Sequence, residues 1–149
     1  MDILRYRERL IEYRHQINLA EPDNPIEGIC MAVREGHMVK KLRDRQGVQL
    51  CANYPNYTYE GSEDNRIRRG MWLLYLIEKV PAGSRTDEEE LTAYARMARK
   101  MDRLLELLTE EGAMCDGYGE AGAKLRVEWE FDVFGGWCGL SVSLEMEER

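Results

Sequence analysis

The chain has 149 residues, of which 44% are hydrophobic and 33% are charged, and its net charge at pH 7 is −7. This length fits one domain, residues 1–149, that can bury a core without disulfides or metals. The composition excludes a disordered chain, and the acidic charge argues against a general nucleic-acid binder. The longest apolar run, Met71 to Ile77, is too short to span a bilayer. The first residues lack a secretory-signal pattern, so we expect a cytoplasmic protein without a membrane partner.

An amphipathic helix is the first predicted element. Its apolar residues recur at spacings of three and four, which places them on one helix face: Ile3, Tyr6, Leu10, Tyr13 and Ile17. Pro22 and Pro25 end this helix. A short apolar run over residues 26–33 favours a strand, although a helical turn is the alternative. Residues 36–46 suggest a brief helix, and residues 48–54 a second strand.

Residues 55–69 are predicted to form a long polar loop, and loops of this length are often functional. The loop holds two tyrosines and three arginines: Tyr57, Tyr59, Arg66, Arg68 and Arg69. The tyrosines could stack on nucleic-acid bases or contact protein, and the acidic chain favours protein. The arginine side chains are either exposed to solvent or bind an acidic surface of another protein.

The middle of the chain contains the clearest secondary-structure signals. Residues 70–80 are almost continuously apolar, which predicts a central strand, with a short buried helix as the competitor. Thr86 and Glu89 form the capping-box pattern that opens a helix. An apolar stripe then continues to the predicted stop at Gly112.

Two alternating strands are predicted at the end of the chain. In the first, apolar residues alternate with charged ones, and Gly135 and Gly136 then break the run. We expect one face of this hairpin, including Trp129 and Phe131, to be part of the core. Trp137 follows the glycines and has two interpretations, a lid on the core or an exposed interface anchor.

The order of these elements predicts an α+β fold. We expect a mainly antiparallel sheet of about four to five strands, with an N-terminal helix and a long central helix packed over one face.

Three carboxylates, those of Glu128, Glu130 and Asp132, share the polar face of one predicted strand. They could hold a divalent cation or act as acid–base groups, form a solvated strand face, or pair with a basic cluster on a neighbouring subunit. The sequence has no nucleophile motif, no histidine pair and no CxxC pair. We therefore expect no catalytic residues, cofactor or metal, and predict that Cys30, Cys51 and Cys138 are buried.

Over nearly its whole length, the chain resembles the tail-completion, or tail-terminator, proteins of tailed bacteriophages and prophages. The likeness lies in the order of elements: the first helix, the strands with a long polar loop, residues 70–77, the helix from Thr86, and the hairpin ending at residues 134–144. The resemblance implies a non-enzymatic neck protein that forms a homo-oligomeric ring, often a hexamer.

The same resemblance implies partners and a place of action. The partners would be other copies of the chain and other tail or head-connector proteins, without direct nucleic-acid readout. The protein would act in the cytoplasm during assembly and in the virion tail afterwards, and residues 55–69 would contact neighbours or project toward a lumen. Two rivals stay open: a small module that binds a host protein as adaptor or inhibitor, and a metal-dependent enzyme using the acidic strand.

Overall fold

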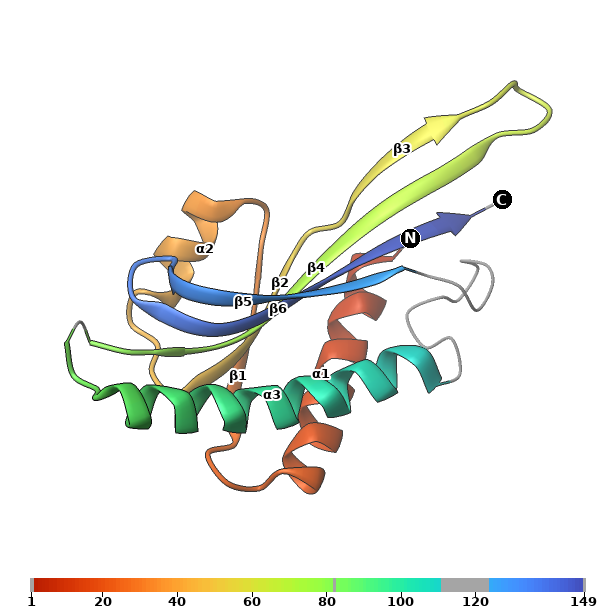
Figure 1. The fold of residues 1–149 in the computed structure, drawn as a ribbon. Coiled ribbons are helices and arrows are strands. Elements are labelled where there is room, and N and C mark those ends of the chain that lie inside the picture. The colour runs from red at the N-terminus through yellow and green to blue at the C-terminus, as the bar shows by residue number, and fades with distance from the viewer. Residues whose placement is uncertain (1, 82, 111–123, 149) are drawn as a thin grey trace.

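The computed structural model describes residues 2–81, 83–110 and 124–148, which form a six-stranded sheet and three helices (Figure 1). In chain order the elements are α1 (Ile3–Ala20), β1 (Ile26–Ala32), α2 (Glu35–Leu42), β2 (Val48–Asn53), β3 (Asn56–Glu60), β4 (Ile67–Lys79), α3 (Asp87–Thr109), β5 (Leu125–Val133) and β6 (Trp137–Glu148). The strand order is β1-β2-β4-β6-β5, and β3 pairs with β4. Only the β1–β2 pair is parallel. The predicted α+β class is confirmed.

The long strand β4 is the centre of the sheet. It pairs with β6 from Arg68 to Lys79, with β2 over residues 74–78, and with β3 over residues 67–71. The central strand predicted at residues 70–80 is therefore confirmed.

The prediction of a loop over residues 55–69 is wrong, because Asn56–Glu60 forms β3 and the chain returns along β4. This segment contains Tyr57, Thr58 and Tyr59, residue types that favour strands, and its polarity comes from exposure of the whole hairpin. We call residues 56–71 the arm, and Figure 1 shows it extending away from the helices.

Helices α1 and α3 cover one face of the sheet, which we call the helical face. The apolar stripe predicted for α1 is buried at Tyr6, Leu10, Tyr13 and Ile17, whereas Ile3 is partly exposed. These side chains and those of α3 pack on residues from β1, β2, β4 and β6 to form the larger core. The capping box of α3 is present as predicted, since the Glu89 amide donates to Thr86 Oγ1 at 3.2 Å.

Helix α2 covers the opposite face. Met38 and Leu42 pack there with Cys30, Cys51 and Trp137 in a second core. The expectation that helices cover only one face is thus wrong. The reason is the parallel pairing of β1 and β2, which needs a crossover, and α2 forms that crossover. Cys138 is also buried, so the prediction for all three cysteines is confirmed.

A buried lysine joins the turn after α1 to the middle of α3. Lys100 is 1% exposed and donates to the backbone oxygens of Glu21, at 3.1 Å, and Asp23, at 2.7 Å. Removal from water lowers the pKa of Lys100, because burial disfavours the charged form. None of the described helices combines the length and apolar character that crossing a membrane requires.

Candidate interaction surfaces

One face of the arm carries both tyrosines and two arginines. Tyr57 and Tyr59 are 51% and 57% exposed, and their rings lie 5.8 Å apart, edge to face. The Arg68 guanidinium lies 3.9 Å from the centre of the Tyr57 ring, and that of Arg66 lies 5.7 Å from the centre of the Tyr59 ring. At these distances, each cation is attracted to the face of the ring. We call Tyr57, Tyr59, Arg66 and Arg68 the tyrosine face of the arm.

Arg69 lies on the other face of the arm. Its Nε forms an ion pair of 3.0 Å with Glu60, and both side chains are about half exposed. Exposed ion pairs of this kind contribute little to stability, so they can exchange partners at low cost. The structure thus brings all five predicted residues of segment 55–69 together on the arm.

Strand β5 exposes a row of apolar side chains. Val127, Trp129 and Phe131 are 38%, 65% and 71% exposed, so the prediction that Trp129 and Phe131 belong to the core is wrong. Leu125 is the residue of β5 that packs against the larger core, as a partly buried neighbour. The described part of β5 pairs only with β6, which makes β5 an edge strand. We call Val127, Trp129 and Phe131 the apolar edge row.

A tyrosine of α3 places Trp129 on the helical face. The rings of Tyr94 and Trp129 lie 5.7 Å apart, edge to face, and the Tyr94 hydroxyl donates to the backbone oxygen of Glu130 at 2.8 Å. Burial is the main cause that raises the pKa of Tyr94 to about 12. This hydroxyl therefore stays protonated at neutral pH and holds β5 to the start of α3.

The three predicted carboxylates of β5 have different surroundings. Glu128 is exposed and pairs with Arg126 at 2.9 Å, while Glu130 accepts a hydrogen bond of 2.8 Å from Ser141 Oγ. Asp132 is exposed at a local irregularity of the strand, where its φ is +52°. Among the residues that the structure describes, no three histidine, cysteine or acidic side chains converge as metal ligands.

Trp137 is buried, with 1% exposure, in the core under α2. The sequence left two interpretations of Trp137, a residue that covers the core or an exposed residue at an interface. Its burial agrees with the first and contradicts the second. The reason is its place at the start of β6, where it pairs with Lys79 of the central strand.

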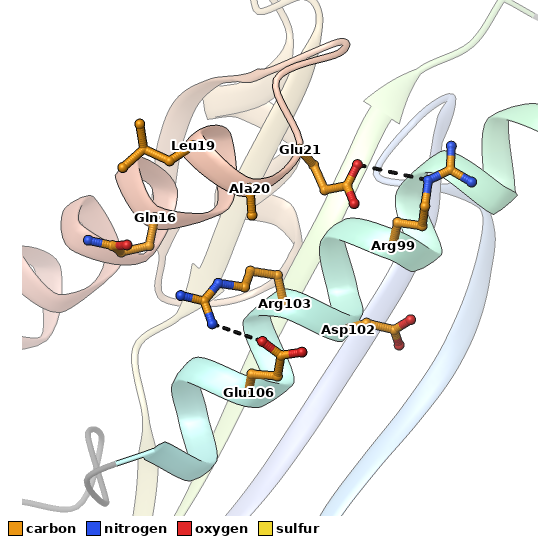
Figure 2. A pocket seen from close by; sticks show the side chains of 8 residues that line it. All are labelled: Gln16, Leu19, Ala20, Glu21, Arg99, Asp102, Arg103 and Glu106. Atoms are coloured by element: carbon orange, nitrogen blue, oxygen red, sulfur yellow. Dashed lines mark hydrogen bonds and ion pairs between the residues drawn. The ribbon is translucent and has the colours of Figure 1, made fainter.

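An open groove of about 540 Å³ lies between the end of α1 and the middle of α3 (Figure 2). Figure 2 shows Arg99 reaching from α3 toward Glu21, at 3.9 Å, and Arg103 paired with Glu106 at 2.8 Å. Both arginines of the groove are therefore paired with carboxylates, and the lining, which also includes Asp102, has a net charge of −1. These side chains form a polar seam between two helices and present no nucleophile.

Cys30 and Cys51 are neighbours on the parallel strands β1 and β2. A hydrogen bond from the Cys51 thiol lowers the pKa of Cys30 to about 7, whereas burial raises that of Cys51. Both side chains are at most 1% exposed beneath α2, so solvent does not reach them in the folded state.

The tyrosine face and the apolar edge row lie at separate places on the same side of the sheet. Arg68 is eight residues from Leu76 along β4, about 26 Å at the usual rise of a strand. Leu76 pairs with Leu140, which in turn pairs with Trp129.

No protein-family model and no curated protein matches this chain.

Proposed function

We propose that this protein is a non-enzymatic structural subunit that assembles with its own copies into a ring, as a tail-completion or tail-terminator protein of a tailed phage or prophage. The apolar edge row is the observation that carries the proposal. Trp129 and Phe131 are large, aromatic and mostly exposed on an edge strand. Contiguous exposed apolar residues of this kind mark interaction sites, and aromatic residues dominate binding energy at such sites.

The charges of the two surfaces favour a second copy of this chain as the partner. Between residues 126 and 132, β5 carries one arginine and three carboxylates, a net charge of −2. The tyrosine face of the arm carries two arginines. Over its whole length, residues 56–71, the arm carries three arginines and three carboxylates and so has no net charge. The acidic β5 strand therefore meets less like-charge repulsion from the arm of another copy than from a second β5 strand.

The fold is compatible with this role but does not assign it. The 23-residue helix α3 packs along the sheet, and the arm extends away from this packed part of the molecule (Figure 1). Because one fold class can serve many functions, the proposal rests on the surfaces and on the resemblance of the sequence to tail-completion proteins. Other tail or head-connector proteins would be the further partners of the ring.

Sedimentation velocity across protein concentration and salt tests the proposal. We expect species whose mass is a fixed multiple of 17.4 kDa, and less of them as salt rises from about 0.05 to about 0.5 M, because ions screen the charged contacts. Leu19→Lys is the matched control, because Leu19 is 65% exposed at the end of α1, where it lines the groove between α1 and α3 and belongs to neither surface. A monomer at every concentration and salt contradicts ring assembly, and a monomer that copurifies with one host protein favours the binding-module alternative.

A further inference from the structure

We propose that the arm of one copy docks on the β5 edge of the next copy, so that the subunits join head to tail. This inference rests on the proposed self-assembly and specifies the contact that produces it. The occupant of the apolar edge row is thus the tyrosine face of a second copy of this chain.

Both partners in this contact are edge strands. Within the described residues, β3 pairs only with β4, and β5 pairs only with β6. Each strand therefore keeps one edge of backbone N–H and C=O groups that faces away from its own sheet. A strand of another chain can hydrogen-bond to such an edge and extend the sheet.

The side chains of the two strands match in spacing and chemistry. Tyr57 and Tyr59 are two residues apart on β3, so both lie on one face of that strand. Trp129 and Phe131 are also two residues apart on β5, whose pairing with β6 is regular as far as Glu130. The tyrosines lie on the helical side of the sheet, because Tyr57 pairs with Gly70, two residues before the buried Trp72. Adding β3 to β5 with the helical faces aligned would place tyrosines beside Trp129 and Phe131, in cross-strand aromatic pairs.

The charges also favour the arm over other occupants of this edge. Glu128 and Glu130 lie on the face of β5 opposite Trp129, because they pair with Ser141 and Gly139. Arg69 lies on the face of the arm opposite the tyrosines. With the helical faces aligned, Arg69 would therefore lie on the same side as these two carboxylates. A symmetric contact of β5 with β5 would instead bring two strands of net charge −2 together, and like charges at close range oppose pairing.

One molecule cannot satisfy its own two surfaces, because they lie about 26 Å apart along a rigid sheet. The contact must therefore form between copies, and it uses a different surface on each. Such a heterologous contact repeats from copy to copy and closes into a ring or continues as a filament.

Mixing two complementary variants tests this geometry by sedimentation. Tyr57→Ser with Tyr59→Ser removes the arm surface, and Trp129→Ser with Phe131→Ser removes the edge surface. Each variant alone is expected to remain monomeric, since a contact needs both surfaces and loss of central aromatic anchors weakens binding by about tenfold or more. The equimolar mixture is expected to give a dimer and nothing larger, because one intact arm and one intact edge remain per pair.

Cross-linking gives an independent measurement. In a Cys115→Ser background, a Tyr59→Cys variant is mixed with a Phe131→Cys variant and oxidised under mild conditions. The native Cys30, Cys51 and Cys138 are buried, so a cross-linked dimer reports the introduced thiols. We expect the dimer in the mixture and little of it in either variant alone.

The outcomes separate this inference from the proposed function. If the wild type assembles but the mixture stays monomeric or forms full-size assemblies, and no mixed cross-link appears, then the arm-to-edge contact is wrong and self-assembly stands. If the wild type is monomeric under all conditions, both proposals fall. Far-ultraviolet circular dichroism of each variant checks that the exposed substitutions leave the fold intact, as their exposure of half or more predicts.

Discussion

Strands β5 and β6 carry the same alternating pattern, yet one apolar row is exposed and the other is buried. Val127 and Trp129 pair directly with Val142 and Leu140 across the ladder. Val142 and Leu140 are at most 2% exposed, whereas Val127 and Trp129 are 38% and 65% exposed. Neighbouring positions on one face of one sheet therefore have opposite environments.

The difference comes from the helices above the sheet. Met97, Met101 and Leu104 of α3 belong to the same core as Leu140 and Val142 of β6. On β5, Tyr94 of α3 contacts Trp129 and the backbone of Glu130, and Leu125 packs against the larger core, but Val127, Trp129 and Phe131 stay exposed. Alternation thus determines which side chains share a face, and the position of the helices determines which part of that face is covered.

The largest expected effect on stability comes from comparing alanine substitutions of two tryptophans on the helical face of the sheet. Trp72 on β4 is 2% exposed and meets the Tyr6 ring edge to face at 4.0 Å. Trp72→Ala is expected to lower the free energy of unfolding by about 3–5 kcal/mol, through lost burial and the cavity that remains. Trp129→Ala should cost less than about 1 kcal/mol, because its main loss is one aromatic contact.

Urea unfolding measures both variants, at a protein concentration where sedimentation shows monomers. If Trp129→Ala destabilises the monomer as much as Trp72→Ala does, then the apolar edge row is part of the core and the comparison fails. Conversely, Trp129→Ala should reduce self-assembly strongly.

The sequence predicted most of the fold from local signals. The stripe of α1, the central strand and the capping box of α3 each depend on residues close together in the chain, so each could be found without the structure. The parallel pairing of β1 with β2 could not, because it depends on contacts between segments far apart. The polarity of the segment around Tyr57 predicts a loop, but here it reflects the exposure of β3 and not an irregular backbone.

The sequence gives one signal that distinguishes β5 from β6. On β5 the residues between the apolar ones are charged, Arg126, Glu128, Glu130 and Asp132, whereas on β6 the corresponding positions are Gly139, Ser141 and Ser143. Charge at every second position is typical of edge strands, where it discourages aggregation. This contrast indicates the edge, but it does not tell whether a helix covers the apolar side.

A second prediction concerns the covered region and its buried lysine. Lys100→Met keeps much of the aliphatic volume but leaves the backbone oxygens of Glu21 and Asp23 without their donor. We expect a loss of about 2–3 kcal/mol in the free energy of unfolding, the usual cost of buried hydrogen bonds to a charged group. Arg99→Ala is the matched control. Arg99 lies 3.9 Å from the Glu21 carboxylate and its side chain is 55% exposed. This ion pair should therefore contribute less than about 0.5 kcal/mol to the free energy of unfolding. Equal effects of the two substitutions would contradict the structural role of Lys100.

The start of α3 provides a smaller effect. Thr86→Ala removes the hydroxyl that accepts from the Glu89 amide, and should lower the free energy of unfolding by about 1 kcal/mol. Thr86→Ser, which keeps an acceptor, is the control and should retain most of the stability. Because Tyr94 lies on the same helix and contacts Trp129, fraying of this end should also increase hydrogen exchange in β5. Unchanged exchange there would show that β5 does not depend on the start of α3.

The smallest expected effect is the pH dependence of the same cap. Hydrogen bonds to Thr86, first that with its backbone N–H, lower the pKa of Glu89 below its ordinary value of 4.5. The folded state thus favours the carboxylate, so its contribution is complete above pH 4.5 and is lost as the pH falls through the lowered pKa. Glu89→Gln keeps a side-chain acceptor without the charge, and its stability deficit should shrink toward zero in acid. Thermal unfolding of both proteins from neutral pH to about pH 3 measures the deficit.

Glu88→Gln, one residue earlier and outside the capping box, serves as the control. In acid Glu89 becomes protonated, so its side chain is uncharged like that of Gln. A stability deficit of Glu89→Gln that grows as the pH falls would therefore contradict a capping role for the charge.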